Sequence, residues 1–242
     1  RVRLTIRAVW EMLVPVKRIL FLLALVCALC VSAAQRPNIV LIMADDLGYQ
    51  DLSCYGSTKH KTPVLDKLAK EGIRLTSFYA GATVCTPSRM ALLTGAYPPR
   101  VGWRGGVVGY GIKTLNGLAP EALTMGEVFK GAGYETALIG KWHLGDDVIR
   151  QHGFDEWIST EDGHAPEYTK REYRTQMSDW HQHLVANGFE PDIERPDGGG
   201  PMFSPMKRAL LPAEFQMASF LGDRAADFID RNSDDPFVLH VS

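Results

Sequence analysis

One apolar run near the start of the chain restricts the fold more than any other feature. Residues 38–44 read Asn-Ile-Val-Leu-Ile-Met-Ala, with no charged side chain. A continuous run of this length predicts a strand that is buried on both faces, as the strands of parallel sheets are. Because parallel strands need a crossover connection, usually a helix, the run favours an α/β fold.

The segments that follow alternate between helical and extended patterns. Thr124 and Glu127 form a capping-box pattern at a helix start, and apolar residues recur at helical spacing over 215–229. Further strands are predicted at 73–79, 136–139 and 237–241, and further helices at 63–71 and 87–94. This alternation predicts an α/β fold with a mainly parallel, doubly wound sheet flanked by helices.

The helix predicted at 63–71 has recognisable boundaries. Thr62 suits its N-cap, Pro63 its first position and Gly72 its end. Its apolar residues share one face, which we expect to be buried; they are Val64, Leu65, Leu68 and Ala69.

Composition limits the functional classes. The chain has 242 residues, enough for one large domain, and 45% of them are hydrophobic. Its formal net charge of −2 argues against a nucleic-acid-binding protein, which should be markedly basic.

The first 34 residues are predicted to be a secretory signal peptide. Lys17 and Arg18 precede an uncharged apolar run at 19–31, and small residues at 32–34 follow. The run is short for a membrane span, so we expect cleavage after Ala34, export, and no stable membrane insertion afterwards. An uncleaved membrane anchor is the alternative. A start at Met12 would make residues 1–11 an upstream translation artefact.

Two carboxylates follow the first predicted strand directly. Asp45 and Asp46 come after residues 38–44, and ligands of open α/β sheets bind beyond the carboxyl ends of strands. Adjacent carboxylates repel each other unless a cation or hydrogen bonds offset the repulsion. Hard oxygen ligands predict Ca²⁺ or Mg²⁺. The alternative is an ordinary turn or helix cap, where Asp is common.

A second pair of charged residues follows the strand at 136–139. Lys141 and His143 alternate with Trp142, so both could point the same way while Trp142 points elsewhere. These two residues could form a functional site at this strand end, or they could be solvated loop residues; both interpretations remain open. His240, within the strand at 237–241, is interpreted as packed, and His181 and His183 as surface residues of an irregular segment at 163–211.

A cysteine and an arginine lie at the start of the helix predicted at 87–94. Pro87 suits the first helical position and Gly95 the end, so Cys85 is expected just outside the helix N-terminus. Unpaired N–H groups and the helix dipole favour anions there, and Arg89 can point back toward the same spot. Alternatively, Cys85 could form a disulfide with Cys54 in an oxidising compartment.

Three strand ends thus present reactive or charged groups to one expected crevice, since the carboxyl ends of parallel strands share an edge of the sheet. They carry Asp45 with Asp46, Cys85 with Arg89, and Lys141 with His143.

The sequence Cys-Thr-Pro-Ser-Arg at 85–89, followed by Leu-Thr-Gly at 93–95, resembles the signature of the type I sulfatases, formylglycine-dependent enzymes of the alkaline phosphatase superfamily. Further stretches are similar to that family. They are 36–49 with the two aspartates, 51–56, 95–100, 133–145 with Lys141 and His143, and 152–155.

The resemblance implies hydrolysis of sulfate esters on aryl compounds or carbohydrates. A formylglycine-generating enzyme would oxidise Cys85 to formylglycine, whose hydrate attacks sulfur and later expels sulfate. Asp45, Asp46 and modified Cys85 would bind a divalent cation, usually Ca²⁺. Arg89 would hold the hydrate, Lys141 would contact the sulfate, and His143 the hydrate.

The chain also departs from the family pattern. Family members run much further than Ser242, and the expected leaving-group histidine, a second lysine and a later pair of metal ligands are not found. We therefore expect residues 35–242 to be the N-terminal part of a sulfatase catalytic domain, incomplete for catalysis, with the C-terminal part missing. A phosphate or phosphonate monoester hydrolase of the same superfamily and a non-catalytic secreted binding protein are the alternatives.

Overall fold

The computed structural model describes residues 36–103, 105, 117–144, 152–159, 179–189 and 211–242. Residues 38–242 form one unit by their contacts, and the expected signal peptide at 1–34 lies outside the described residues. Within the described ranges, no helix has the length and apolar character needed to cross a membrane.

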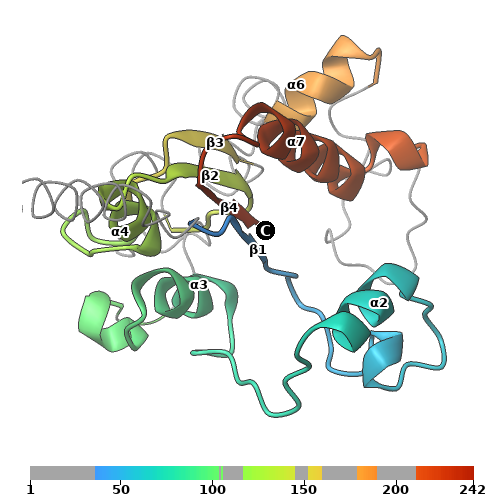
Figure 1. The fold of residues 1–242 in the computed structure, drawn as a ribbon, viewed down its shortest axis with the longest axis horizontal. Helices are drawn as coiled ribbons and strands as arrows, with labels where there is room; N and C mark the ends of the chain where they lie inside the picture. The colour runs from blue at the N-terminus through green and yellow to red at the C-terminus, as the bar shows by residue number, and fades with distance from the viewer. Residues whose placement is uncertain (1–35, 104, 106–116, 145–151, 160–178, 190–210) are drawn as a thin grey trace, which may run out of the picture. The chain divides into compact units, whose positions relative to one another are not determined.

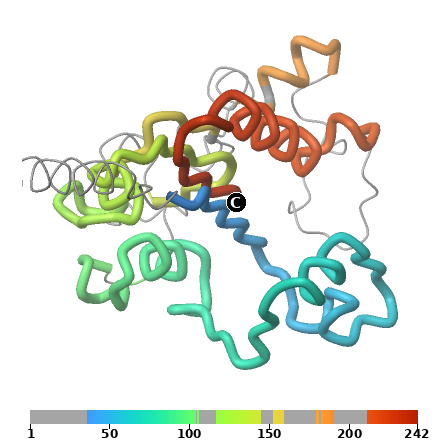
Figure 2. Tube along the Cα trace, in the orientation of Figure 1, coloured from blue at the N-terminus to red at the C-terminus, as the bar shows by residue number. Residues whose placement is uncertain are grey.

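In the described part of the chain, four parallel strands form the sheet (Figure 1). They are β1 (Ile39–Ile42), β2 (Glu135–Gly140), β3 (Glu156–Ser159) and β4 (Phe237–Val241). Their order is β1-β4-β2-β3, and every neighbouring pair is parallel. In the trace of Figure 2 the first strand runs beside the last, in agreement with the pairing of Ile39 with Val238. The predicted parallel sheet is confirmed.

Helices pack on both faces of this sheet, as a doubly wound fold requires. On one face α7 (Met217–Arg231) buries Phe220, Leu221 and Phe228 against residues of β2 and β4, including Ile139 and Leu239. On the other face α3 (Cys85–Thr94) packs Met90 and Leu93 with Leu138 and Trp142. The alternating residues of β2 therefore belong to two separate apolar clusters.

The predicted helix boundaries are mostly confirmed. At the start of α4 (Met125–Gly131), the Thr124 side chain accepts from the Glu127 N–H and Glu127 Oε2 accepts from the Thr124 N–H, which completes the capping box. Helix α2 (Pro63–Glu71) begins and ends at the predicted residues. Short 3₁₀ helices occupy Ser53–Tyr55 (η1), Pro98–Val101 (η2) and Ala213–Phe215 (η5).

Three expectations about burial and pairing are wrong. Residues 73–79 form no strand, and the Phe78 side chain is 74% exposed. The apolar face of α2 is not buried, because no described element covers it. Strand β1 is open on one face, where Ile42 is 70% exposed, because no described element covers that face.

One strand and one α-helix were not expected. Strand β3 has only four residues and follows the 152–155 motif directly. Helix α6 (Asp179–Ala186) lies within the segment expected to be irregular, most of which is outside the described residues. On α6 the His183 ring packs 5.1 Å from the Phe220 ring, so this histidine has a packing role; His240 is buried, as predicted.

Candidate active site

The ends of β1 and β2 bring oppositely charged side chains together across the end of β4. Asp45 follows β1 and Lys141 follows β2, and the Lys141 ammonium donates to Asp45 Oδ2 at 2.7 Å. Both strands flank β4 and run parallel to it, so all three strands end at the same edge of the sheet. The expected meeting of these two strand ends is confirmed.

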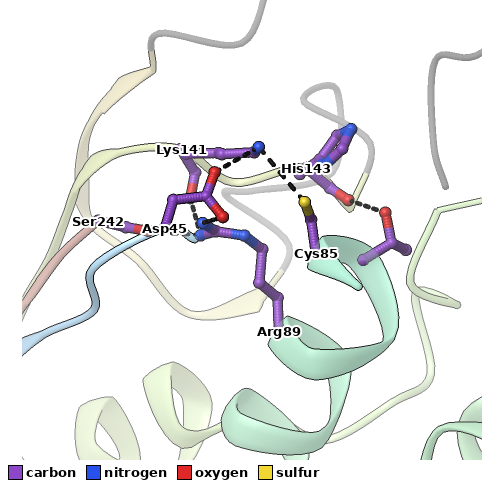
Figure 3. Close-up of polar contacts among 7 residues, drawn as sticks. Asp45, Cys85, Arg89, Lys141, His143 and Ser242 are labelled. Atoms are coloured by element: carbon purple, nitrogen blue, oxygen red, sulfur yellow. Dashed lines mark hydrogen bonds and ion pairs between the residues drawn. The ribbon is translucent and has the colours of Figure 1, made fainter. Parts of the chain in front are cut away.

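Cys85 reaches the same place from a helix rather than from a strand. It is the first residue of α3, whose N-cap is Val84, and not a residue outside the helix as predicted. Pro87 is tolerated in the third position, because the first helical N–H groups have no intrahelical acceptor in any case. The half-buried Cys85 thiol lies 3.7 Å from Lys141 Nζ (Figure 3).

A further hydrogen bond fixes the start of α3 to the segment after β2. The Thr86 hydroxyl donates to the His143 carbonyl oxygen at 3.0 Å, and both residues are buried. Trp142, between Lys141 and His143, enters the core beside Met90, as the expected alternation requires.

Arg89 lies one helical turn after Cys85, on the same side of α3. Its side chain is 1% exposed. One guanidinium nitrogen, Nη1, donates to the Lys141 carbonyl oxygen at 2.6 Å and also to Ser242 Oγ. The other, Nη2, lies 3.8 Å from Asp45 Oδ1. A buried guanidinium with hydrogen-bond acceptors from two segments, and with a carboxylate of a third segment at ion-pair distance, is a fixed positive charge beside the thiol (Figure 3).

The surrounding cations control the charge of Asp45. Partial burial alone would raise the pKa of its carboxyl group, but the hydrogen bond and charge of Lys141, with the charges of Arg89 and His143, lower that pKa below its usual value. Asp45 is therefore ionised at neutral pH, and it offsets part of the positive charge around Cys85.

The two predicted site residues Asp46 and His143 share an unusual backbone conformation. Their φ angles are 54° and 56°, and within the described ranges they are the only residues other than glycine with positive φ. Such conformations are uncommon for residues with a side chain and cluster at functional sites. His143 is buried, whereas Asp46 is exposed and lies outside the contacts drawn in Figure 3.

Ser242, which the sequence did not single out, completes the cluster. It follows β4, and its backbone N–H donates to the Ile139 carbonyl at 2.9 Å while its carbonyl accepts from the Lys141 N–H at 3.2 Å. Gly140 permits this approach, because a Cβ built there would lie 1.9 Å from the Ser242 carbonyl oxygen. The position directly after the predicted strand at 237–241 was the signal that could have identified Ser242.

The predicted alternative of a disulfide between Cys54 and Cys85 is wrong, since neither cysteine is disulfide-bonded. Cys54 lies in η1, where its carbonyl accepts from Arg74. The thiol of Cys85 is thus available for chemistry beside Lys141.

The carboxylate side chains at this site are suitable ligands for a hard cation. Asp45 and Asp46 offer carboxylate oxygens, the ligands that Ca²⁺ and Mg²⁺ prefer. Among the described residues, however, no group of three or more His, Cys, Asp or Glu side chains is arranged to bind a metal, and Asp45 pairs with Lys141 and Arg89. A cation here would therefore need additional oxygen ligands, since Ca²⁺ takes about 6–8.

The family profile and the curated relatives agree on one family. The sequence profile of the sulfatases matches residues 37–242. Over 138 residues the chain is 51% identical to steryl-sulfatase of Mus musculus, which covers 52% of this chain and 22% of that protein. Over 124 residues it is 52% identical to arylsulfatase A of Homo sapiens, which covers 51% of this chain and 24% of that protein.

Among solved structures, the chain is similar to a Bacteroides thetaiotaomicron protein from a genetic locus for the metabolism of multiple glycosaminoglycans. The TM-score is 0.58 and the sequence identity 29%, over 86% of this chain and 51% of that protein. The matched part of this chain spans about a quarter of the length of the two curated relatives.

The protein has a parallel sheet flanked by helices, and its charged groups lie beyond the carboxyl ends of the strands. These features define an α/β protein with the fold that sulfatases share with alkaline phosphatase. The family profile covers most of the chain, and the chain belongs to the sulfatase family. That family generally uses formylglycine and a divalent cation.

Proposed function

We propose that the protein hydrolyses sulfate esters of aryl or carbohydrate substrates, with a nucleophile derived from Cys85. The observation that carries the proposal is the position of the Cys85 thiol. It lies at the N-terminus of a ten-residue helix, 3.7 Å from Lys141 Nζ and one turn from the buried Arg89. This arrangement suits a tetrahedral anion, and relatives that carry the names steryl-sulfatase and arylsulfatase A favour sulfate.

The chemistry calls for more than a thiol at position 85. We infer that a formylglycine-generating enzyme oxidises Cys85 to an aldehyde. One hydroxyl of the hydrated aldehyde would then attack sulfur and release the alcohol, and the second hydroxyl would lose its proton, expel sulfate and restore the aldehyde. Arg89 would orient this side chain from one turn below, and its buried charge would offset negative charge as it develops.

Lys141 is the residue best placed to bind the sulfate. Its ammonium lies between the Asp45 carboxylate and the Cys85 thiol, at 2.7 and 3.7 Å. An entering sulfate would add an anionic partner on the Cys85 side without requiring Lys141 to leave Asp45. His143, whose backbone is held by Thr86, would hold or accept a proton at the residue derived from Cys85.

A divalent cation, Ca²⁺ or Mg²⁺, would be held by Asp45, Asp46 and the oxygens of modified Cys85. Its contribution would be to offset charge on the sulfate oxygens. The left-handed backbone at Asp46 supports this assignment, because it changes the chain direction directly after the Asp45 carboxylate.

The charged, apolar and small-residue pattern at 17–34 supports export, with residues 35–242 belonging to the exported protein. The protein would then act on sulfated small molecules or glycans in the periplasm, outside the cell or in another extracytoplasmic compartment. This proposal requires that the formylglycine-generating enzyme meets the chain before or during export.

The test is ester hydrolysis by the full-length protein produced together with a formylglycine-generating enzyme. We expect turnover of p-nitrophenyl sulfate to exceed that of p-nitrophenyl phosphate and of a phenylphosphonate monoester, and Cys85→Ala to abolish it. Faster turnover of the phosphonate ester would favour the alternative hydrolase, and full sulfate turnover by Cys85→Ala would refute the proposed nucleophile.

A further inference from the structure

We propose that Ser242 is a positioning residue of this site, whose hydroxyl orients Arg89 and whose backbone fixes Lys141. The inference rests on the proposed function, because it concerns how the two cations beside Cys85 are held. Ser242 does not touch Cys85 in the contacts described above, so its effect would pass through Arg89 and Lys141.

The side chain of Ser242 gives Arg89 a neutral acceptor. Arg89 Nη1 donates to Ser242 Oγ and to the Lys141 carbonyl oxygen, so two neutral oxygens from two strand ends fix this nitrogen. The carboxylate of Asp45 is further away, 3.8 Å from Nη2. Because a buried charged group requires hydrogen-bond acceptors, these two oxygens determine where the guanidinium lies.

The backbone of Ser242 cannot move freely relative to β2. Its N–H donates to the Ile139 carbonyl and its carbonyl accepts from the Lys141 N–H, so it is bonded to β2 on both sides of Gly140. The contact at Gly140 is so close that a Cβ would lie 1.9 Å from the Ser242 carbonyl oxygen. This geometry requires a glycine at 140, which has no Cβ and adopts a φ of 114°.

The face of β4 that carries Ser242 is turned toward Arg89. Side chains alternate along a strand, so His240 and Ser242 share one face, opposite Leu239, which packs against α7. His240 is buried, and the positive charge of Arg89 helps to keep its imidazole neutral. The ring therefore adds no second charge that would repel Arg89.

Loss of the Ser242 hydroxyl should let Arg89 turn toward the Asp45 carboxylate, which Lys141 already binds. The guanidinium of Arg89 and the ammonium of Lys141 would then both be displaced relative to Cys85. Since a misplacement of about 1 Å can cost up to about 100-fold in rate, we expect Ser242→Ala to lower kcat by about 10- to 100-fold with a smaller change in KM.

The experiment compares Ser242→Ala and Ser242→Thr in the full-length protein, on whichever ester the unaltered protein turns over, at matched aldehyde content of residue 85. Ser242→Thr keeps the hydroxyl and should recover most of kcat. Ser219→Ala is the matched control, because Ser219 lies on α7 and donates to the Ala213 carbonyl, away from the site. This control should keep full kcat.

Binding of inorganic sulfate, measured by calorimetry, gives a readout that does not depend on turnover. Ser242→Ala should bind sulfate more weakly than the unaltered protein, and Ser219→Ala equally well. An unchanged kcat and sulfate affinity in Ser242→Ala would overturn the inference. So would equal losses in Ser242→Ala and Ser242→Thr together with a lower melting temperature, since these would show a purely structural role. Failure of the proposed function appears separately, as absent sulfate turnover or full activity of Cys85→Ala.

Discussion

Lys141 and Asp45 are 96 residues apart in the sequence, and the Lys141 ammonium donates to the Asp45 carboxylate at 2.7 Å. The contact joins the ends of β1 and β2, which do not neighbour each other, because β4 lies between them. The same contact holds the Lys141 ammonium group beside the Cys85 thiol. Assembly of the site therefore depends on correct pairing of β4 with both strands.

The first prediction concerns the charge coupling in this pair. Lys141→Met removes a hydrogen bond and a positive charge from Asp45, so the pKa of the Asp45 carboxyl should rise. Carbon-13 NMR titration of the Asp45 carboxyl carbon measures the change. Lys67→Met is the control, because Lys67 pairs only weakly with Glu71 on the exposed face of α2. An unchanged Asp45 titration in Lys141→Met would show that this pair does not set the charge of Asp45.

The second prediction concerns the cation. Asp45→Asn removes a carboxylate charge while nearly preserving shape, so bound Ca²⁺ or Mg²⁺ should decrease and turnover should fall. Elemental analysis of the purified full-length protein measures occupancy. Asp227→Asn, which alters a surface pair with Arg224 on α7, should keep the metal content of the unaltered protein. Equal metal content in Asp45→Asn and Asp227→Asn would contradict the assignment of Asp45 as a ligand.

The third prediction is a pH dependence of stability caused by His240. Burial, and to a lesser extent the charge of Arg89, lowers the pKa of His240 from 6.5 to about 4. The unfolded chain takes up this proton as the pH falls below 6.5, whereas the folded chain does so only near 4. The lowered pKa of His240 thus decreases the free energy of unfolding by about 3 kcal/mol once the pH is below about 4. Above pH 6.5, the pKa of histidine in the unfolded chain, it has no effect.

Urea unfolding at about pH 7.5 and about pH 4.5 tests this sign. The unaltered protein should lose more stability between these two values than His240→Gln, which cannot take up the proton. Titrations of other groups are common to both proteins and cancel in the difference. An equal or larger loss in His240→Gln would show that His240 is not buried in its neutral form.

The fourth prediction concerns the close approach at Gly140. Gly140→Ala places a Cβ against the Ser242 carbonyl at a backbone φ of 114°, so it should destabilise the protein by at least about 2 kcal/mol and reduce turnover. Gly131→Ala is the control, because a Cβ at the end of α4 meets nothing within 4 Å. That variant should be neutral or slightly stabilising in thermal unfolding. Equal melting temperatures for the two variants would contradict the close approach.

Local patterns predicted much of the fold because they depend on nearby residues. The Thr124 capping box, the ends of α2 and the strands at 136–139 and 237–241 all follow from short-range propensity. Burial was harder to predict, since it depends on which elements cover a face. The apolar face of α2 and the exposed side of β1 have no cover among the described elements.

The site was predictable where strand ends carry charged residues, as at Asp45 and Lys141. Cys85 was expected outside its helix, because Pro87 suits the first position as well as the third. Ser242 was not expected, because its role depends on β4 lying between β1 and β2, and strand order cannot be read from local patterns. The same reason explains why a glycine at 140 gave no signal.

We propose that Cys85 becomes the formylglycine nucleophile of a sulfatase. The most direct measurement is mass spectrometry of the peptide that contains residue 85, from full-length protein that hydrolyses p-nitrophenyl sulfate. We expect the CH₂–SH group of Cys85 to be replaced by an aldehyde, which also reacts with a hydrazide probe. An unmodified Cys85 thiol in protein that turns over the sulfate ester would contradict it.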